Sequence, residues 1–244
     1  IDNFSNPSTQ ECRFPVKRGS YADLDSLAEY DVVIHLAASI NVDESILKPL
    51  DYVQNNVTGT TRFLETFRTT NPNGKFIYAS SSEVYGTAKT PLMSEEHPLD
   101  PLSPYAVTKL AAEQLCKNYA QIFNLDITVI RHFNGFGPYQ RKGVYGGVIA
   151  KFKDLGTQGK DLTIFGGGEQ SRDYTYISQV ISGYMLAIEK KLPTIINFGS
   201  GFSVTINDIA AHIAKKYEVG IKHLPSRPNE VMRLEADVSK AVSY

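Results

Sequence analysis

The feature that most constrains the fold is a regular alternation of short apolar runs with longer amphipathic stretches. Three runs, at residues 32–36, 75–79 and 127–130, are almost continuously apolar and rich in β-branched residues. Between them, residues 52–69 and 104–123 carry apolar side chains at helical spacing. Runs of the first kind are typical of strands buried on both faces, and stretches of the second kind predict helices packed on a sheet. The alternation therefore predicts a doubly wound, parallel α/β sheet.

The start of the second helix is marked by its own residues. Ser103 is a plausible N-cap, because its hydroxyl can accept a hydrogen bond from a free backbone N–H of the first turn. Pro104 suits the first helical position, where no N–H is needed. We therefore expect the helix to begin at Pro104.

After about residue 132 the segments become shorter and glycines cluster, first over residues 135–147 and then at 166–168. A helix pattern follows at 176–189, a strand at 194–198 and another helix pattern at 204–217. We expect residues 1–132 to form one domain and residues 133–244 to form mainly a smaller α/β region. The smaller region would sit at the carboxyl ends of the first sheet, and some later segments would return to the first domain.

Composition excludes several classes of protein. The chain has 25 Lys and Arg against 26 Asp and Glu, so it offers no general attraction to nucleic acid or to an anionic membrane. No apolar run approaches the roughly 20 residues of a membrane helix, and no signal peptide opens the chain. Cys12 and Cys116 lack metal-ligand spacing. We expect a reduced, cytoplasmic protein without a metal centre.

A tyrosine and a lysine in the second helix form the first chemical motif. Tyr105 and Lys109 are four residues apart, so they share one helix face. An ammonium close to a phenol favours the phenolate and lowers a pKa that is otherwise near 10. Such a tyrosine can act as an acid and base near neutral pH, although the spacing alone is also common on ordinary helix surfaces.

A serine cluster directly follows the strand predicted at residues 75–79. Ser80, Ser81 and Ser82 are followed by Glu83. Ligands of doubly wound sheets bind at the carboxyl ends of strands, so these hydroxyls are placed to meet a substrate. Serines at this point could equally just end the strand and cap the next turn.

Together with other stretches, these motifs resemble the extended short-chain dehydrogenase/reductases, specifically their nucleotide-sugar epimerase/dehydratase family. The resemblance runs along essentially the whole chain, with Tyr105 and Lys109 near its centre. The stretches that carry it are His35–Ala38, Asn56 with Gly59 and Thr60, Ala79–Gly86, Arg131–Pro138, Gly168–Tyr176, Asn197–Gly201, Arg227–Glu230 and Ala236–Ala241.

The resemblance implies a Rossmann-type domain that binds NAD. Asp2 matches a carboxylate that holds the adenosine ribose hydroxyls, which favours NAD over NADP by charge repulsion. Lys109 matches the lysine that also holds the nicotinamide ribose. The residues that the resemblance assigns to the cofactor are Asp2, Asn3, Leu36, Ala37, Ala38, Asn56, Tyr105 and Lys109.

The resemblance also implies catalytic and substrate-binding residues. The catalytic set is Ser81, Glu83, Tyr105 and Lys109, with Tyr105 as the base. Arginines suit a diphosphate because their planar fork satisfies two phosphate oxygens at once. The residues assigned to the nucleotide sugar are Ser81, Ser82, Asn134, Arg172, Tyr174, Arg227 and Glu230.

Two departures concern the cofactor. Members of the family begin with a strand, a Gly-x-x-Gly-x-x-Gly turn and a helix that binds the NAD pyrophosphate, and the present sequence begins after that segment. We expect a truncated chain; the alternative is a protein that has lost its cofactor phosphate site. Ser20 stands where the family usually has an acid near the adenine.

The reaction itself stays open among related alternatives. Family members that perform 4,6-dehydration usually carry Asp-Glu after the catalytic hydroxyl, whereas this chain has Ser82 and Glu83. That pair is also similar to sugar-nucleotide decarboxylases and GDP-mannose dehydratases. The surroundings look more like 4-epimerases, so we expect NAD-dependent 4-epimerisation of a UDP-sugar. A dehydratase, a decarboxylase, a reductase and a non-catalytic nucleotide-binding protein are the alternatives.

The sequence specifies neither the sugar nor the nucleobase of the substrate, and GDP- and dTDP-sugars remain alternatives. The sugar would be selected by loops at residues 82–86, 140–147 and 200–203.

The helices at 52–69 and 104–123 correspond to those by which family members pair into a four-helix bundle. We therefore expect a homodimer through these helices.

Overall fold

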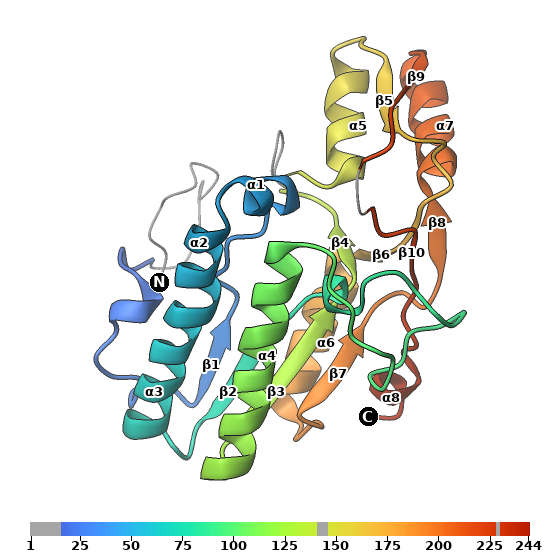
Figure 1. The fold of residues 1–244 in the computed structure, drawn as a ribbon. Coiled ribbons are helices and arrows are strands. Elements are labelled where there is room, and N and C mark those ends of the chain that lie inside the picture. The colour runs from blue at the N-terminus through green and yellow to red at the C-terminus, as the bar shows by residue number, and fades with distance from the viewer. Residues whose placement is uncertain (1–15, 141–145, 228–229) are drawn as a thin grey trace.

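The computed structural model describes residues 16–140, 146–227 and 230–244, which form a sheet with flanking helices and a second, smaller region (Figure 1). The predicted NAD contacts Asp2 and Asn3 lie outside the described residues. The strands are β1 (Val32–His35), β2 (Lys75–Ala79), β3 (Asp126–His132), β4 (Asn134–Phe136), β5 (Leu162–Phe165), β6 (Ser171–Tyr176), β7 (Ile195–Phe198), β8 (Ser203–Thr205), β9 (Ile221–Leu224) and β10 (Arg233–Leu234).

The helices lie between these strands. The α-helices are α1 (Val42–Leu47), α2 (Pro49–Tyr52), α3 (Thr60–Thr70), α4 (Pro104–Phe123), α5 (Val148–Thr157), α6 (Ile177–Glu189), α7 (Ile206–Tyr217) and α8 (Ser239–Val242). The tighter and wider helical turns are η1 (Tyr21–Asp23), η2 (Val53–Gly59) and η3 (Ser82–Tyr85).

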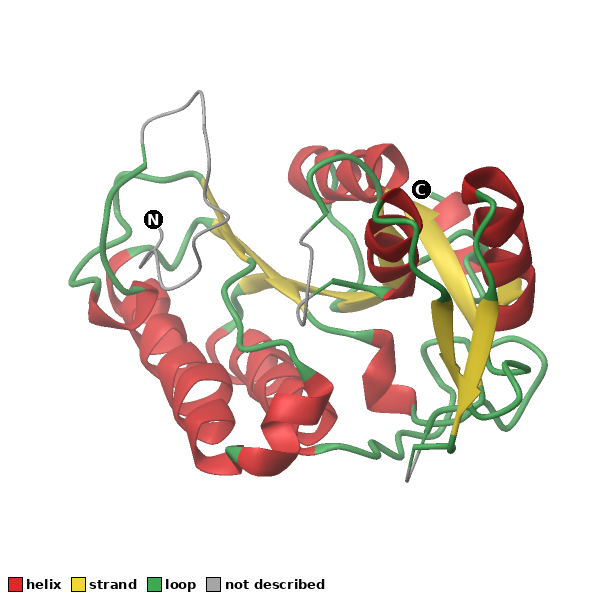
Figure 2. Ribbon diagram, turned by 90° about the horizontal axis from the view of Figure 1, so that it is seen from above, coloured by secondary structure: helices red, strands yellow, loops and turns green. Residues whose placement is uncertain are grey.

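The central sheet has the order β1-β2-β3-β7, and all of its neighbouring strands are parallel. Helices α3 and α4 cover one face and α6 covers the other (Figures 1 and 2). This arrangement confirms the predicted doubly wound, Rossmann-type sheet. Strand β7 comes from the second half of the chain, so the polypeptide returns to the central sheet after building the smaller region.

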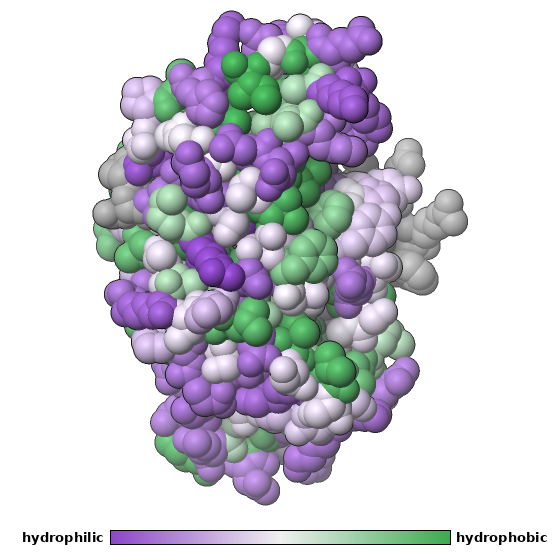
Figure 3. Space-filling view, turned by 90° about the vertical axis from the view of Figure 1, so that its right-hand side faces the viewer, coloured by the Kyte–Doolittle hydropathy of each residue, from purple (hydrophilic) through white to green (hydrophobic). Residues whose placement is uncertain are grey.

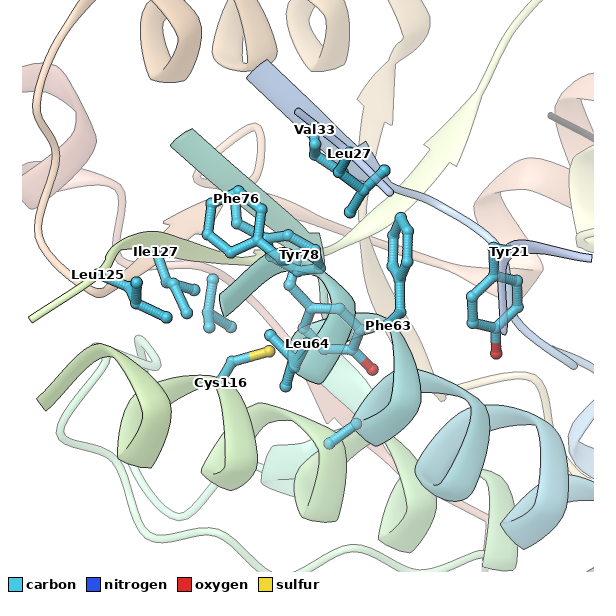
Figure 4. Close-up of a cluster of buried hydrophobic side chains, with 13 residues drawn as sticks. Tyr21, Leu27, Val33, Phe63, Leu64, Phe76, Tyr78, Cys116, Leu125 and Ile127 are labelled. Carbon is cyan, nitrogen blue, oxygen red and sulfur yellow. The ribbon is translucent and has the colours of Figure 1, made fainter. Parts of the chain in front are cut away.

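The strand sequences explain why both faces are covered. Successive residues of a strand point to opposite faces, so an unbroken apolar run needs a partner on each side. Phe76 and Tyr78 of β2 pack against α3 and α4, and Figure 4 shows Leu64 and Cys116 of these helices pointing toward them. Ile77, between them in sequence, packs on the α6 side.

The helical segment predicted at residues 52–69 extends over Pro49–Thr70 and contains the π-helical stretch η2. Wide turns of this kind occur frequently at functional sites. The side chain of Asn56 in η2 is buried and bonded to Ser39 on both its oxygen and its nitrogen. The same amide nitrogen donates to Thr108 Oγ1 at 3.1 Å, which ties η2 to α4.

Helix α4 begins where the sequence predicts. Ser103 is its N-cap, with a side chain that accepts from Ala106 N at 3.1 Å, and Pro104 is its first residue. This start fixes which residues of α4 face the sheet, and it places Tyr105 in the first turn.

The smaller region contains two further sheets. One has the order β10-β6-β4, with β8 antiparallel to β6, and the other pairs β5 with β9. Helices α5 and α7 pack on each other and on β5 through a separate apolar core. On the side where α7 and α8 lie, hydrophobic side chains are scattered among hydrophilic ones (Figure 3).

Candidate active site

The predicted catalytic residues come from two adjacent segments. Ser81 follows β2 and caps η3, accepting a hydrogen bond from Glu83 N at 3.2 Å. Tyr105 and Lys109 lie one turn apart on the sheet-facing side of α4. The Ser81 side chain lies near enough to the Tyr105 hydroxyl group to affect the pKa of that group. The fold therefore brings together the serine, tyrosine and lysine that the sequence singles out.

The electrostatics of Tyr105 differ from the prediction. We expected the Lys109 ammonium to lower the pKa of the phenol. Burial instead raises the pKa of Tyr105 to about 12, while the neighbouring Ser81 side chain lowers it and the Glu83 carboxylate raises it. The prediction was wrong because the Lys109 ammonium is engaged elsewhere: it donates to the carbonyl oxygen of Ala79 at 2.5 Å and lies 4.3 Å from the centre of the Tyr78 ring.

Lys109 is itself strongly affected by its surroundings. Burial lowers the pKa of Lys109 to about 7, partly offset by the nearby Glu113 carboxylate. Its charge also contributes to lowering the pKa of His35 to about 3 and of His132 to about 4, where burial is the larger cause. Both imidazoles are therefore neutral near pH 7, and Lys109 is the buried group that titrates close to neutrality.

Glu83 lies close to the catalytic hydroxyl groups. Burial raises the pKa of its carboxyl group, and the positive charge of Arg172 lowers it. Ser82, beside it, is buried. A carboxyl group with a raised pKa keeps its proton to higher pH and can therefore donate it during a reaction. Arg172 is a predicted diphosphate ligand, so this interaction links the catalytic group to the second half of the site.

The residues predicted to hold NAD lie at the carboxyl end of β1. The Leu36 side chain is 61% exposed there, Ala37 is exposed and Ala38 is half-buried, so the strand ends in an open apolar surface. A dinucleotide lies across the carboxyl ends of parallel strands. Exposed apolar and small side chains at this strand end are compatible with a bound dinucleotide, and the predicted NAD contacts Tyr105 and Lys109 lie on α4.

Four of the seven predicted substrate residues line a cavity of about 180 Å³ in the smaller region, whereas Ser81 and Ser82 lie at the end of β2. Asn134 of β4, Arg172 and Tyr174 of β6, and Glu230 all line it. Arg227 does not line the cavity, but its guanidinium group lies 4.0 Å from the centre of the Phe165 ring, which does. Four residues spread over almost 100 positions of sequence thus share one cavity.

Two polar atoms at this cavity lack a partner. Asn134 Oδ1 and the Tyr174 hydroxyl group are buried, and neither has a hydrogen bond to any residue that the structure describes. Buried polar groups in proteins are almost always hydrogen-bonded, so such atoms call for an explanation. Both residues line the cavity, so a polar ligand seated there explains them.

Sequence reasoning missed several residues of the cavity. Phe165 and Gln170 flank the glycine run at 166–168; Gln170 donates to the carbonyl oxygen of Phe165 at 2.9 Å and to Glu230 at 3.2 Å. The glycine run itself was the available signal, because a tight turn brings its two flanking residues together. The further lining residues are Gly135, Phe136, Gln140, Gly147, Val148, Ile149, Phe152, Thr163, Ile164 and Ile206.

Comparisons with known proteins agree with this geometry. The sequence model of the family described as GDP-mannose 4,6 dehydratase matches residues 18–244. The chain belongs to this family. It is one of the extended short-chain dehydrogenase/reductases, whose nucleotide-sugar members include NAD-dependent epimerases, dehydratases and decarboxylases.

Individual relatives carry different reaction names. The chain is 32% identical to a UDP-N-acetyl-alpha-D-glucosaminuronate decarboxylase from Bacillus cytotoxicus, over 91% of this chain and 76% of that protein. It is similar to the crystal structure of a UDP-glucuronic acid 4-epimerase from Bacillus cereus in complex with UDP-glucuronic acid and NAD, with a TM-score of 0.87 and 36% identity over 96% of this chain and 76% of that chain.

A UDP-N-acetylglucosamine 4-epimerase from Methanobrevibacter ruminantium matches with a TM-score of 0.88 and 32% identity, over 98% of this chain and 78% of that one. The chain thus spans about three quarters of the length of these relatives.

Within residues 16–140, 146–227 and 230–244, no helix has the length and apolar character to cross a membrane.

Proposed function

We propose that the protein catalyses the NAD-dependent 4-epimerisation of a nucleotide sugar, with UDP as the carrier. The observation that carries the proposal is that Ser81 and Tyr105 are buried neighbours at the carboxyl end of the sheet, one turn from Lys109. A hydroxyl pair of this kind can hold a sugar hydroxyl and exchange a proton with it. The cavity with Arg172 and Glu230 offers a binding place for the nucleotide on the same side of the molecule.

Each residue of the pair has a distinct role. Tyr105, as the phenolate, takes the proton from the C4 hydroxyl group of the sugar, and Ser81 holds that oxygen by a hydrogen bond. Because burial raises the pKa of Tyr105 to about 12, the phenolate would need a positive charge beside it, which bound NAD would supply. Leu36, Ala37, Ala38 and Asn56 would hold NAD together with Lys109, and Asp2 and Asn3 would contact its adenosine half. The chemistry that NAD supplies when bound is reversible acceptance of the C4 hydride, so the cofactor is regenerated within each turnover.

The nucleotide would stay bound while the sugar rotates within the site. Arg172 and Arg227 would neutralise the diphosphate, Asn134 and Tyr174 would donate or accept hydrogen bonds there, and Glu230 would hold the nucleotide ribose. Retention at these groups lets a 4-keto sugar rotate and receive the hydride on its other face. On this proposal, residues 1–132 with β7 bind NAD, and residues 133–244 mainly bind the nucleotide sugar.

A dehydratase or decarboxylase is the second candidate, and Glu83 favours it. Its carboxyl group is buried close to Tyr105, and its raised pKa would let it deliver a proton to a leaving group or to a carbanion. The related proteins carry all three reaction names. The reaction products distinguish the candidates directly.

We further propose a homodimer through the helical segments 52–69 and 104–123. Apolar side chains are exposed on these segments: Val53 on one, and Val107, Ile122 and Phe123 on the other. Pairing two such faces would remove them from water. Light scattering coupled to gel filtration tests the pairing: a dimer mass supports it, and a monomer at micromolar concentration contradicts it.

The decisive experiment uses the protein with its natural termini. UDP-glucose, UDP-N-acetylglucosamine and UDP-glucuronate are each incubated with it, and the C4 configuration is followed by proton NMR, first without and then with added NAD. Inversion at C4 is the expected result. A 4-keto-6-deoxy product or release of carbon dioxide would establish the second candidate, and binding without any turnover would indicate a non-catalytic nucleotide-binding protein.

A further inference from the structure

Helix α4 carries a third buried polar residue on the face that holds Tyr105 and Lys109. Glu113 follows Lys109 by four residues and is completely buried. Its carboxylate forms an ion pair with Arg131 of β3, which is also buried. The Arg131 Nε atom donates to both carboxylate oxygens, at 3.1 and 3.2 Å, and Nη2 donates to one of them at 2.5 Å.

The three residues of α4 meet three consecutive residues at the end of β2. Tyr105 lies beside Ser81, and Lys109 donates to the carbonyl oxygen of Ala79. Glu113 accepts from the Ser80 hydroxyl group at 2.8 Å. Residues four apart share one face of a helix, so all three side chains can reach the segment at residues 79–81. Each side chain on this face of α4 therefore holds a different point of the segment that carries Ser81.

Arg131 is fixed from its other side. Its Nη1 atom donates to the Tyr85 hydroxyl group at 2.8 Å and to the carbonyl oxygen of Glu95 at 2.9 Å. Tyr85, at the end of η3, in turn donates to Asn197 of β7 at 2.6 Å. The Glu113 carboxylate is thereby held by a chain of hydrogen bonds that runs from α4 through β3 to η3 and β7.

Stability alone does not account for this network. Removing two charges from water is costly, and a buried ion pair is commonly no more stabilising than apolar side chains of the same volume. The ion pair does fix the position of α4 relative to β3, because a two-point arginine–carboxylate contact tolerates little rotation or sliding. The elements it fixes are those that carry Ser81 and Tyr105.

We propose that Glu113, held by Arg131, is the positioning residue of the active site and sets the distance between Ser81 and Tyr105. The inference rests on the proposed function for its catalytic consequence, but the positioning itself is a property of the protein without substrate. Glu113 touches neither the sugar nor the cofactor in this account. Its effect passes through Ser80 and through the register of α4 on β2.

The test replaces the network by apolar groups, which keeps the fold. The variant is Ser80→Ala/Glu113→Met/Arg131→Met, and Glu113→Gln is a second variant that retains the shape of the side chain. The matched control is Thr128→Val, because Thr128 is buried on β3 and its hydroxyl group has no partner among the described residues. Circular dichroism and thermal unfolding establish that each variant is folded.

Two measurements follow on each folded protein. The first is turnover: we expect kcat to fall about 100-fold in the triple variant, as for a small misplacement of reacting groups, with KM within about twofold of the wild type. The second needs no turnover and is the ¹³Cζ chemical shift of Tyr105, assigned with Tyr105→Phe. We expect the signal to move to its position in a Ser81→Ala variant, where the neighbouring hydroxyl group is absent.

The outcomes separate the two proposals. If the wild-type protein turns over no nucleotide sugar, the proposed function fails, and the Tyr105 signal still decides the positioning. A folded triple variant with an unshifted Tyr105 signal overturns the inference, as does kcat within twofold of the wild type. If the triple variant does not fold, Glu113→Gln decides by the same two measurements. Thr128→Val should behave as the wild type in both.

Discussion

The catalytic cluster at the end of β2 and the cavity beside β6 differ in how their polar groups are satisfied. In the cluster, Ser81, Tyr105 and Lys109 are buried: Ser81 accepts from Glu83 N, Lys109 donates to Ala79, and Tyr105 lies beside Ser81. At the cavity, Asn134 Oδ1 and the Tyr174 hydroxyl group have no partner among the residues described. Groups that perform chemistry are held in place beforehand, whereas groups that bind leave their hydrogen-bonding capacity to the ligand.

Both the catalytic cluster and the cavity bury polar groups at a cost in free energy. Burial in the cluster raises the pKa of Tyr105 to about 12 and lowers the pKa of Lys109 to about 7, so the charged form of each is disfavoured. At the cavity an unsatisfied buried group costs roughly 1–3 kcal/mol until a ligand meets it. The following predictions test this division, beginning with the largest expected effect.

Removing the Tyr105 hydroxyl group should abolish the chemistry. We expect Tyr105→Phe to lower kcat by about three orders of magnitude or more, because the proton acceptor is lost while the ring still fills its place. Affinity for UDP, measured by calorimetry, should stay unchanged, since the cavity is untouched. Tyr119→Phe on the same helix is the control and should keep its activity. Near-normal turnover by Tyr105→Phe would contradict the division.

Replacing Lys109 by methionine should lower kcat by about 100-fold and also remove a pH dependence of stability. The pKa of Lys109 is about 7 in the folded protein and 10.5 when unperturbed. Between these values the unfolded chain binds more protons, so the free energy of unfolding rises with pH, by at most about 1.4 kcal/mol for each pH unit.

Urea unfolding of both proteins between pH 6 and pH 10 measures this difference. The wild type should gain stability relative to Lys109→Met as the pH rises from 7 toward 10. Lys117→Met, an exposed lysine of α4, is the control and should follow the wild type. Parallel stability curves for the wild type and Lys109→Met would show that burial does not lower the pKa of Lys109.

Arg172 should act on binding more than on catalysis. We expect Arg172→Ala to raise KM for a nucleotide sugar about 10- to 100-fold. This is the effect of losing hydrogen bonds between charged groups, which are worth about 1.5–3 kcal/mol. Steady-state kinetics and calorimetry with UDP measure it. Arg68→Ala removes an exposed arginine of α3 and should leave KM unchanged. A fall in kcat at constant KM would place Arg172 with the catalytic groups instead.

The smallest effect compares two tyrosine hydroxyl groups. We expect Tyr174→Phe to leave thermal stability unchanged or slightly raised, and to weaken UDP binding about threefold to tenfold. Tyr85→Phe should instead destabilise the protein by about 1–3 kcal/mol, because the Tyr85 hydroxyl group joins Arg131 to Asn197. Equal stability losses in both variants would mean that the two regions do not differ in this way.

Much of the fold and of the site was predictable because it depends on local spacing. Apolar runs and helical periodicity predicted the parallel sheet, and Ser103 with Pro104 predicted the start of α4. The four-residue spacing of Tyr105 and Lys109 predicted that they share a face. The cavity residues were less accessible: Asn134, Arg172 and Glu230 were found by resemblance. Phe165 and Gln170 were missed because the glycine run between them indicates a turn but not the cavity that the turn helps to form.

The sequence by itself determined which residues end each strand, which lie on the buried face of α4, and which family the motifs resemble. The tertiary structure decided the burial, the contacts and the pKa values of those residues. The pKa of Tyr105 rises instead of falling because burial outweighs a lysine that is bound to Ala79. Glu113, Arg131, Tyr85 and Asn197 meet only because four elements converge on one point, and burial and convergence depend on the whole chain rather than on spacing within it.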